Sequence, residues 1–297
     1  MLIKLMILML MGQIDTIKVV FTNDIIGQFG EKGASFINPV FPPPLGGAAS
    51  FYTYLKNTRK TYPNLLLFDT GNMTGGYVSG QDIRLDKTIK FYKLMGYNAM
   101  VPGWREFFKG EDGIEYLHKN GITLLAANLT YKRDTLKNFD GVLPYKIFNV
   151  DGVKIGVFGL TTEKMPLFAN DWWIKQTFFL REIETARRMV NILKNKGADI
   201  IILLSSTGSA REKAIADSVY GIDFIFGGFM GYGLREPYEN YYTHTVILRN
   251  YRSFSQAMEV NIFYDKIAHC ITGYKAKQIT LMEEDLEPDE RILKEFE

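Results

Sequence analysis

Hydrophobic runs and amphipathic stretches alternate through most of the chain. Short apolar runs rich in β-branched residues predict buried strands, and apolar residues repeating at helical spacing predict the helices between them. This alternation is typical of βαβ units, in which helices connect parallel strands. The pattern predicts strands at residues 17–23, 65–69, 99–101, 124–129, 200–204 and 224–226, and helices at residues 46–62, 85–94, 182–196 and 210–219.

The alternation is interrupted once and later ends. Val150-Asp151-Gly152-Val153 lies between two apolar runs, and an Asp-Gly pair in that position predicts a β-hairpin within residues 145–160. After residue 227 the pattern predicts strands alone, at residues 245–248, 258–264 and 271–281. No linker or repeat divides this order, so we predict a single α/β domain.

The composition is that of a globular protein without a nucleic-acid partner. With 297 residues, 46% of them hydrophobic, the chain can bury a substantial core. Its 35 Lys and Arg against 33 Asp and Glu give a net charge of +2, with no basic stripe to follow a phosphate backbone. The single cysteine, Cys270, excludes an internal disulfide, and its place inside a predicted strand predicts an inert core residue.

The first residues resemble a secretion signal. Within residues 1–13 a short charged start leads into an apolar run, which is the order of regions in an exported protein. The run is too short to span a bilayer as a helix, so no transmembrane segment is expected. We favour a periplasmic or exported protein; the alternative is a cytoplasmic protein whose N-terminal apolar segment packs on the domain.

Polar or glycine-containing segments follow five of the predicted strands. In open α/β sheets the functional loops lie at the carboxyl ends of the strands, so we expect these segments to meet at one edge. In chain order these segments, together with the start of one helix, are Thr22-Asn23-Asp24 with Gly27-Gln28, Gly46-Gly47-Ala48-Ala49, Asp69-Thr70-Gly71-Asn72, Gly103-Trp104-Arg105-Glu106-Phe107, Leu204-Ser205-Ser206-Thr207-Gly208 and Gly227-Gly228-Phe229-Met230-Gly231.

Taken in this order, the six stretches resemble motifs of the N-terminal domain of the 5'-nucleotidase family within the calcineurin-like metallophosphoesterases. The corresponding family patterns are T-N-D-x-H-G, G-G-x-A, an apolar strand ending in G-D, G-N-H-E-F, L-S-H-x-G and G-G-H-S-H. The resemblance implies a four-layer αββα sandwich with mixed sheets flanked by helices. It also implies a dinuclear metal site that polarises a phosphoryl group and generates a hydroxide nucleophile.

Most residues that would hold the two metals in that family are replaced here. Asp24 matches the first ligand, but Asn72 stands at the bridging aspartate, and a neutral amide cannot supply the charge that keeps two dications roughly 3.5–4 Å apart. Arg105, at the catalytic histidine, would repel cations. Other ligand positions carry Ile26, Trp104, Ser206, Phe229 and Gly231. We therefore expect no catalytic residue, no cofactor, and only a vestigial pair, Asp24 and Asn72; an active protein would need a divalent metal such as Mn or Zn.

The resemblance also implies a division of the chain. Residues 14–286 correspond to the metallophosphoesterase-like domain. Residues 287–297 resemble the start of the connector helix that, in the family, leads to a C-terminal nucleotide-binding domain. We expect that C-terminal domain to be absent, and with it the nucleotide specificity that the family achieves there.

Three functions remain open from the sequence. The first is a non-catalytic binding or scaffold protein with a protein partner. The second is a residual metal-dependent phosphate or sulfate ester hydrolase, and the third is an anion or nucleotide binding module that holds a small anion with Arg105, Ser206 and Asn72 without cleaving it. An aromatic cluster, Trp172-Trp173 with Phe178-Phe179, would be a partner surface if exposed.

Single residues carry similar alternatives. We favour Asp24 as a loop-ordering residue that accepts backbone N–H bonds. Arg105 either binds an anion or pairs with Asp24 or Glu106. Aromatic side chains at the positions of Trp104 and Phe229 are more often packing than ligand contacts.

Overall fold

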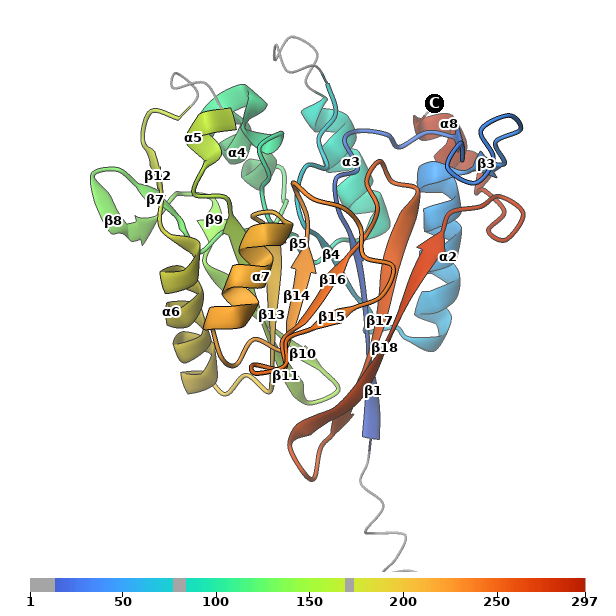
Figure 1. Cartoon of the computed structure of the whole chain (residues 1–297). Helices are drawn as coiled ribbons and strands as arrows, with labels where there is room; N and C mark the ends of the chain where they lie inside the picture. Colours follow the sequence, from blue (N-terminus) through green and yellow to red (C-terminus); the bar gives the residue numbers. More distant parts are fainter. Residues whose placement is uncertain (1–13, 77–83, 169–173, 297) are drawn as a thin grey trace, which may run out of the picture.

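The computed structural model describes residues 14–76, 84–168 and 174–296 (Figure 1). Its larger sheet has seven strands in the order β18-β17-β1-β4-β5-β6-β9. Strands β1, β4, β5, β6 and β9 of this sheet are parallel, and β17 and β18 continue the sheet in antiparallel pairs. The strands are β1 (Ile14–Thr22), β4 (Leu66–Asp69), β5 (Ala99–Met100), β6 (Leu124–Leu125), β9 (Val142–Leu143), β17 (Gln256–Asp265) and β18 (Cys270–Thr280).

The second sheet has six strands in the order β10-β11-β13-β14-β16-β15. Strands β11, β13, β14 and β16 are parallel, and β10 and β15 flank them in antiparallel pairs. Asp151 and Gly152 have φ of 52° and 90°, so the predicted hairpin is confirmed with a two-residue turn. The strands are β10 (Tyr145–Val150), β11 (Val153–Thr161), β13 (Ile200–Ser206), β14 (Phe224–Gly227), β15 (Tyr238–Glu239) and β16 (Val246–Arg249).

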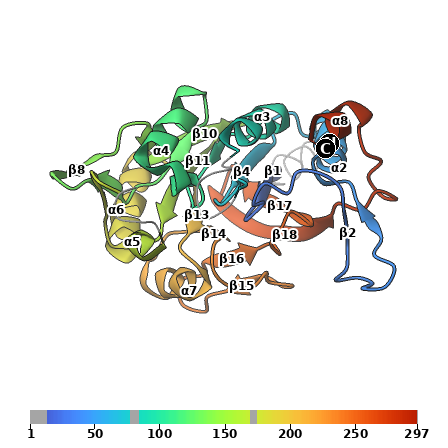
Figure 2. The same cartoon turned by 90° about the horizontal axis from the view of Figure 1, so that it is seen from above.

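Helices cover the outer face of each sheet, and this confirms the four-layer αββα sandwich. On the larger sheet lie α2 (Gly47–Thr61), α3 (Leu85–Met95) and α4 (Gly110–Lys119), whose apolar faces share one core with that sheet. On the smaller sheet lie α6 (Glu182–Asn195) and α7 (Ser209–Ser218). Seen from above, the two groups of helices lie on opposite sides of the paired sheets (Figure 2). Near the C-terminus α8 (Glu290–Phe296), a helix that the sequence predicts, packs on α2.

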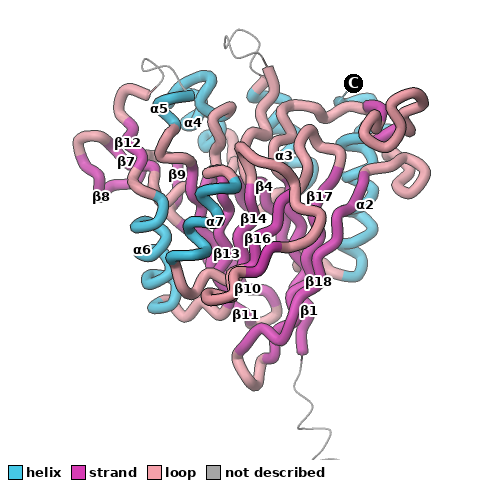
Figure 3. The backbone as a smooth tube through the Cα atoms, in the orientation of Figure 1, coloured by secondary structure: helices cyan, strands magenta, loops and turns pink. Residues whose placement is uncertain are grey.

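A second core fills the space between the two sheets and aligns their strand ends. Alternate residues of a strand point to opposite faces, so Val20 enters the core under the helices and Phe21 enters the core between the sheets. The rings of Phe21 and Phe226 stack with centroids 4.4 Å apart, which joins the end of β1 to the end of β14. The loops that follow the parallel strands consequently gather at one end of the molecule, the upper end in Figure 3.

Two predictions from the sequence are wrong. The apolar run at residues 124–129 is not one strand, because a turn at Ala127 and Asn128 divides it between β6 of the large sheet and β7 (Leu129–Tyr131) of a separate three-stranded sheet. Cys270 is exposed, because it is the first residue of the outermost strand β18, next to a turn. The other short elements are β2 (Lys32–Gly33), β3 (Pro44–Leu45), β8 (Asp134–Asn138), β12 (Thr177–Phe179), a 3₁₀ helix (Glu106–Lys109) and α5 (Met165–Phe168).

Some predictions concern residues outside the described ranges. The signal-like segment at residues 1–13 and the pair Trp172-Trp173 both lie outside them. Of the aromatic cluster, Phe178 is exposed, and Phe179 is buried with its ring 5.7 Å from that of Phe107. Among residues 14–76, 84–168 and 174–296, no helix is both long enough and apolar enough to cross a membrane.

Candidate functional site

Five of the predicted site residues meet where β1, β4, β5, β13 and β14 end. We call Asp24, Asn72, Arg105, Ser206 and Phe229 the loop-end cluster. Asp24 and Asn72 are each 1% exposed, Ser206 is 0% exposed and Phe229 is 6% exposed, so the cluster is largely closed to solvent. The rule that functional loops follow parallel strands therefore placed these side chains correctly.

The carboxylate of Asp24 connects three of these loops. Its Oδ1 accepts a hydrogen bond of 2.8 Å from Nδ2 of Asn72, and its Oδ2 accepts bonds of 3.0 Å from Nδ2 of Asn23 and 3.1 Å from the backbone N–H of Phe229. Burial raises the pKa of Asp24, while these side-chain bonds and the nearby Arg252 lower it. Both carboxylate oxygens are thus engaged by groups of the protein itself.

Glu106 is a buried carboxylate that the sequence pattern did not single out as a site residue. It accepts backbone N–H bonds from Asn72 at 3.0 Å, Thr74 at 2.9 Å and Gly103 at 2.8 Å. Its side chain is fully buried, and burial raises its pKa. A signal existed in the sequence, since Glu106 is an acidic residue in an otherwise aromatic and basic strand-end segment. It shapes the loops around Asn72.

The backbone is left-handed at three cluster residues and at the adjoining Ile26. The φ values are 47° at Asp24, 50° at Ile26, 59° at Asn72 and 66° at Phe229. Such a conformation is uncommon for any L-residue and most unusual for β-branched isoleucine; it costs on the order of 1–3 kcal/mol per residue. It persists because the loops hold one another: the N–H of Ile26 donates to the carbonyl of Asn72 at 2.8 Å. The side chains of Ile26 and Phe229 do not favour this backbone conformation, so the contacts between the loops maintain it.

Arg105 is held by carbonyl groups and aromatic rings. Its Nη1 donates to the carbonyl of Gly76 at 3.1 Å, and its guanidinium carbon lies 5.5 Å from the Trp104 ring and 5.3 Å from the Phe108 ring. In the described ranges no carboxylate lies within 4.0 Å of this guanidinium, so Arg105 makes no direct ion pair with Asp24 or Glu106, although the charges of both act on it. Trp104 packs edge-on against Phe108, with centroids 4.9 Å apart.

The loop that carries Phe229 and Gly231 is anchored by a buried ion pair. Arg249, at the end of β16, pairs with Glu212 on α7, and its Nη2 donates to the carbonyls of Phe229 at 3.2 Å and Met230 at 3.1 Å. Arg249 is 2% exposed and Glu212 is fully buried. No sequence pattern indicated this pair, because the two residues are far apart in the chain.

Ser206 and Gly71 show how tightly the two sheets meet here. The Oγ of Ser206 is buried and has no hydrogen-bond partner within the described part of the chain. A Cβ atom at Gly71, whose φ is 97°, would come within 2.9 Å of that Oγ and of the N–H of Gly103. Only glycine fits at this position, and the close approach leaves little room for a ligand.

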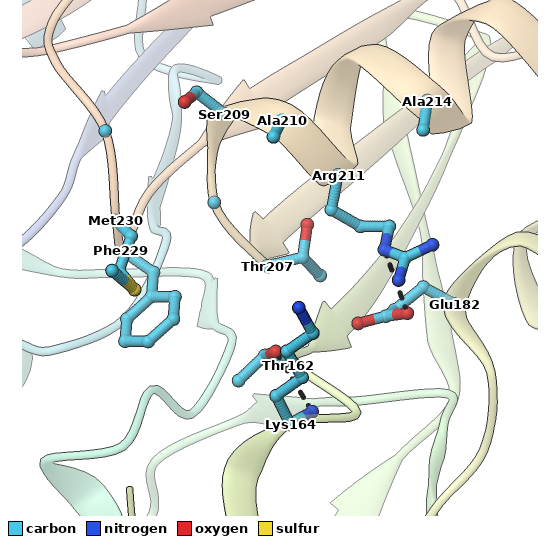
Figure 4. Close-up of a pocket in the computed structure, with 12 residues that line it drawn as sticks. Thr162, Lys164, Glu182, Thr207, Ser209, Ala210, Arg211, Ala214, Phe229 and Met230 are labelled. Atoms are coloured by element: carbon cyan, nitrogen blue, oxygen red, sulfur yellow. Dashed lines mark hydrogen bonds and ion pairs between the residues drawn. The ribbon is translucent and has the colours of Figure 1, made fainter. Parts of the chain in front are cut away.

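A cavity of about 420 Å³ lies beside the cluster (Figure 4). Lys164 and Arg211 contribute cations, and Arg211 Nε lies 3.4 Å from Oε2 of Glu182. Burial raises the pKa of Glu182 to about 7, and the neighbouring Glu163 adds to this shift. Phe229 lines the cavity, whereas Asp24 and Asn72 do not. The cavity is therefore separate from the polar core of the cluster.

The donor set does not fit a dinuclear metal centre. Within the ranges that the structure describes, no three His, Cys, Asp or Glu side chains are grouped so that they could hold a metal ion. The loop-end cluster offers one carboxylate, already engaged, with a neutral amide and a hydroxyl. Two divalent ions in one site need several carboxylate or imidazole ligands and a bridging anion.

The sequence is similar to that of known 5'-nucleotidases. No protein-family model matches the chain. A snake venom 5'-nucleotidase from Gloydius brevicauda is 32% identical over 186 residues, which are 62% of this chain and 31% of that relative. The chain thus spans about a third of the length of the curated relatives it matches.

Solved structures of related proteins share the fold of this chain. A 5'-nucleotidase precursor from Thermus thermophilus has a TM-score of 0.81 at 21% identity, and the match covers 95% of this chain and 57% of that one. A calcineurin-like phosphoesterase from Bacillus subtilis has a TM-score of 0.73 at 16% identity, and the match covers 95% of both chains. At these identities the likeness describes the fold.

Proposed function

The chain is a 5'-nucleotidase-like metallophosphoesterase domain. Within that family we propose that it is a non-catalytic member that acts as a binding or scaffold protein. Membership does not decide activity, because a fold hosts many functions and the site must be argued from its own residues. The proposal therefore depends on the chemistry of the loop-end cluster.

One observation carries the proposal: both oxygens of Asp24 accept hydrogen bonds from the protein, and one donor is the amide of Asn72. A metal ion at Asp24 would have to displace these donors, and Asn72 would then face the ion with a neutral group in place of a bridging carboxylate. Each of these effects weakens binding of a divalent cation.

If the chain were instead a residual hydrolase, Asp24 would have to be available to a metal ion. It would hold that ion either alone or with donors supplied by a partner. The anion-module alternative, as expected at Arg105, Ser206 and Asn72, requires the loops to open, since Ser206 and Asn72 are at most 1% exposed. Export and a protein partner remain predictions.

Ester hydrolysis tests the proposal. Purified protein is incubated with nitrophenyl phosphate, nitrophenyl sulfate or a nucleotide, with Mn²⁺ or Zn²⁺ added. We expect no product above that formed by the Asp24→Asn variant, which serves as the matched control because it keeps the shape of the side chain. A rate that depends on added metal and disappears in Asp24→Asn would contradict the proposal.

A further inference from the structure

A second cavity, of about 620 Å³, lies on the other side of the loop that follows β14. We call it the arginine cavity. Its walls come from the β2–β3, β14–β15 and β16–β17 connections and from β17 and β18, so both sheets contribute to it. Its main side chains are Phe36, Tyr232, Arg235, Tyr251, Arg252 and Gln256. None of the residues that line it is acidic.

The two arginines of this cavity form no direct ion pair with the described part of the protein. Arg235 and Arg252 are exposed side chains, and in the described part of the chain neither guanidinium makes a hydrogen bond or an ion pair. Arg252 lies close enough to the loop-end cluster to lower the pKa of Asp24. Two such groups on one concave surface attract an anion, because guanidinium binds carboxylate and phosphate through several N–H donors at once.

Aromatic rings surround the two arginines. Tyr232 is 89% exposed, Phe36 is 60% exposed and Tyr251 is 43% exposed, and the three come from three separate loops. Exposed rings that converge on a cavity offer faces and edges on which a planar group can stack. This combination distinguishes the arginine cavity from a surface that merely carries positive charge.

Gln256 forms part of the same wall. Its Nε2 donates to Oγ1 of Thr280 at 3.1 Å, and its Oε1 is buried without a donor among the described residues. Because this oxygen is closed to solvent, the ligand contacts are assigned to the arginines and the aromatic rings.

We propose that the arginine cavity binds a small aromatic anion, that is, a planar ring that bears a carboxylate or phosphate group. The anionic group lies between Arg235 and Arg252, and the ring stacks against the tyrosines. The volume suits a small molecule, since ligand cavities in proteins measure about 300–1,000 Å³. The site goes beyond the function proposed above, because it uses none of the residues of the loop-end cluster.

Calorimetric titration of the full chain tests this assignment. The probes are phenyl phosphate and benzoate, with inorganic phosphate and acetate as anions without a ring, and phenol as a ring without the charge. We expect at least one aromatic anion to bind about tenfold or more tightly than its ring-free counterpart and than phenol, because stacking and charge-assisted hydrogen bonds both contribute. Phenol release is recorded in the same samples, so that catalysis is scored separately from binding.

Three variants locate the binding. The double variant Arg235→Gln with Arg252→Gln should weaken the aromatic anion by about tenfold or more, because it removes both charges. Tyr251→Leu should weaken the aromatic anions and leave the ring-free anions unchanged. Arg187→Gln, the same change at an exposed position on α6, is the matched control and should leave binding unchanged. These side chains are exposed, so the variants should retain the melting temperature of the native chain.

Two results would overturn the assignment. One is binding of the aromatic anions that is no tighter than that of inorganic phosphate, acetate and phenol. The other is tighter binding that the double arginine variant and Tyr251→Leu both leave intact, since the site would then lie elsewhere.

Discussion

The loop-end cluster and the arginine cavity share a loop but treat their polar groups in opposite ways. In the cluster, Asp24 and Asn72 are 1% exposed and bond to each other; in the cavity, Arg235 and Arg252 are exposed, and their guanidinium groups bond to no described residue. Polar groups that satisfy one another contribute to the fold, whereas groups without partners remain available to a ligand. Closing one site on this fold therefore leaves room for a different one beside it.

The shared loop explains how both can exist. The N–H of Phe229 donates to Asp24 inside the cluster, and a few residues later Tyr232 and Arg235 line the cavity. Arg249 fixes the loop between these points through the carbonyls of Phe229 and Met230. A rigid loop can therefore close one side and present side chains on the other.

The greatest loss of stability is expected at Glu106, which holds the loops around the cluster. Glu106→Ala leaves three buried backbone N–H groups without an acceptor, and we expect the free energy of unfolding to fall by about 3–5 kcal/mol, because each unsatisfied buried donor costs about 1–3 kcal/mol. Urea denaturation measures the change.

The matched controls for Glu106 come from the surface and from the cavity. Glu115→Ala removes a 43% exposed carboxylate that pairs with Lys119 on α4, and should cost about 0.5 kcal/mol or less. Arg252→Gln should be similarly small, because no described residue depends on its guanidinium. A loss below about 1 kcal/mol in Glu106→Ala would mean that the cluster is not held by its own polar groups.

A smaller effect is expected when the bridging position is restored. Asn72→Asp places a second carboxylate 2.8 Å from Asp24 in a buried site, and should lower the free energy of unfolding at neutral pH by about 2 kcal/mol. The pair shares one proton, so its folded-state pKa is raised above the unfolded value, and the loss should shrink as the pH falls. Denaturation with and without Mn²⁺ measures both points. Full recovery of stability on adding Mn²⁺ would indicate a site that needs only one further carboxylate to hold metal.

The slightest effect concerns Glu182, in the cavity that borders the cluster. Its folded-state pKa of about 7 lies above the ordinary value of 4.5, so its protonated form stabilises the fold fully below pH 4.5, and this contribution is lost as the pH rises through 7. We expect the stability of the native chain relative to Glu182→Gln to fall by about 1 kcal/mol across this window. Urea denaturation at several pH values measures it. A difference that rises with pH would contradict the assigned burial.

Much of the fold could be predicted because its signals are local. The alternation of strands and helices, the Asp-Gly turn and the order of the strand-end segments each depend on neighbouring residues. The helix Gly110–Lys119 escaped prediction because it contains two glycines, and the run at residues 124–129 misled because its turn contains only one polar residue, Asn128.

The candidate site was predictable in place but not in chemistry. Strand-end positions brought Asp24, Asn72 and Phe229 together. The bonds that close the cluster were not predictable, because they use backbone groups, as at Glu106, or partners far apart in the chain, as in Arg249 with Glu212. The arginine cavity was also not predictable, because most of its side chains come from irregular loops that carry no periodic signal.

Metal content is the sharpest test of whether the loop-end cluster is closed to divalent ions. The native chain is incubated with Mn²⁺ or Zn²⁺, freed of excess metal, and its metal content is measured by mass spectrometry beside that of Asp24→Asn. We predict equal contents in the two proteins and fewer than about 0.1 specifically retained ions per chain, because the cluster lacks the charged ligands that such ions require. Two ions per chain in the native protein, lost in Asp24→Asn, would contradict the account.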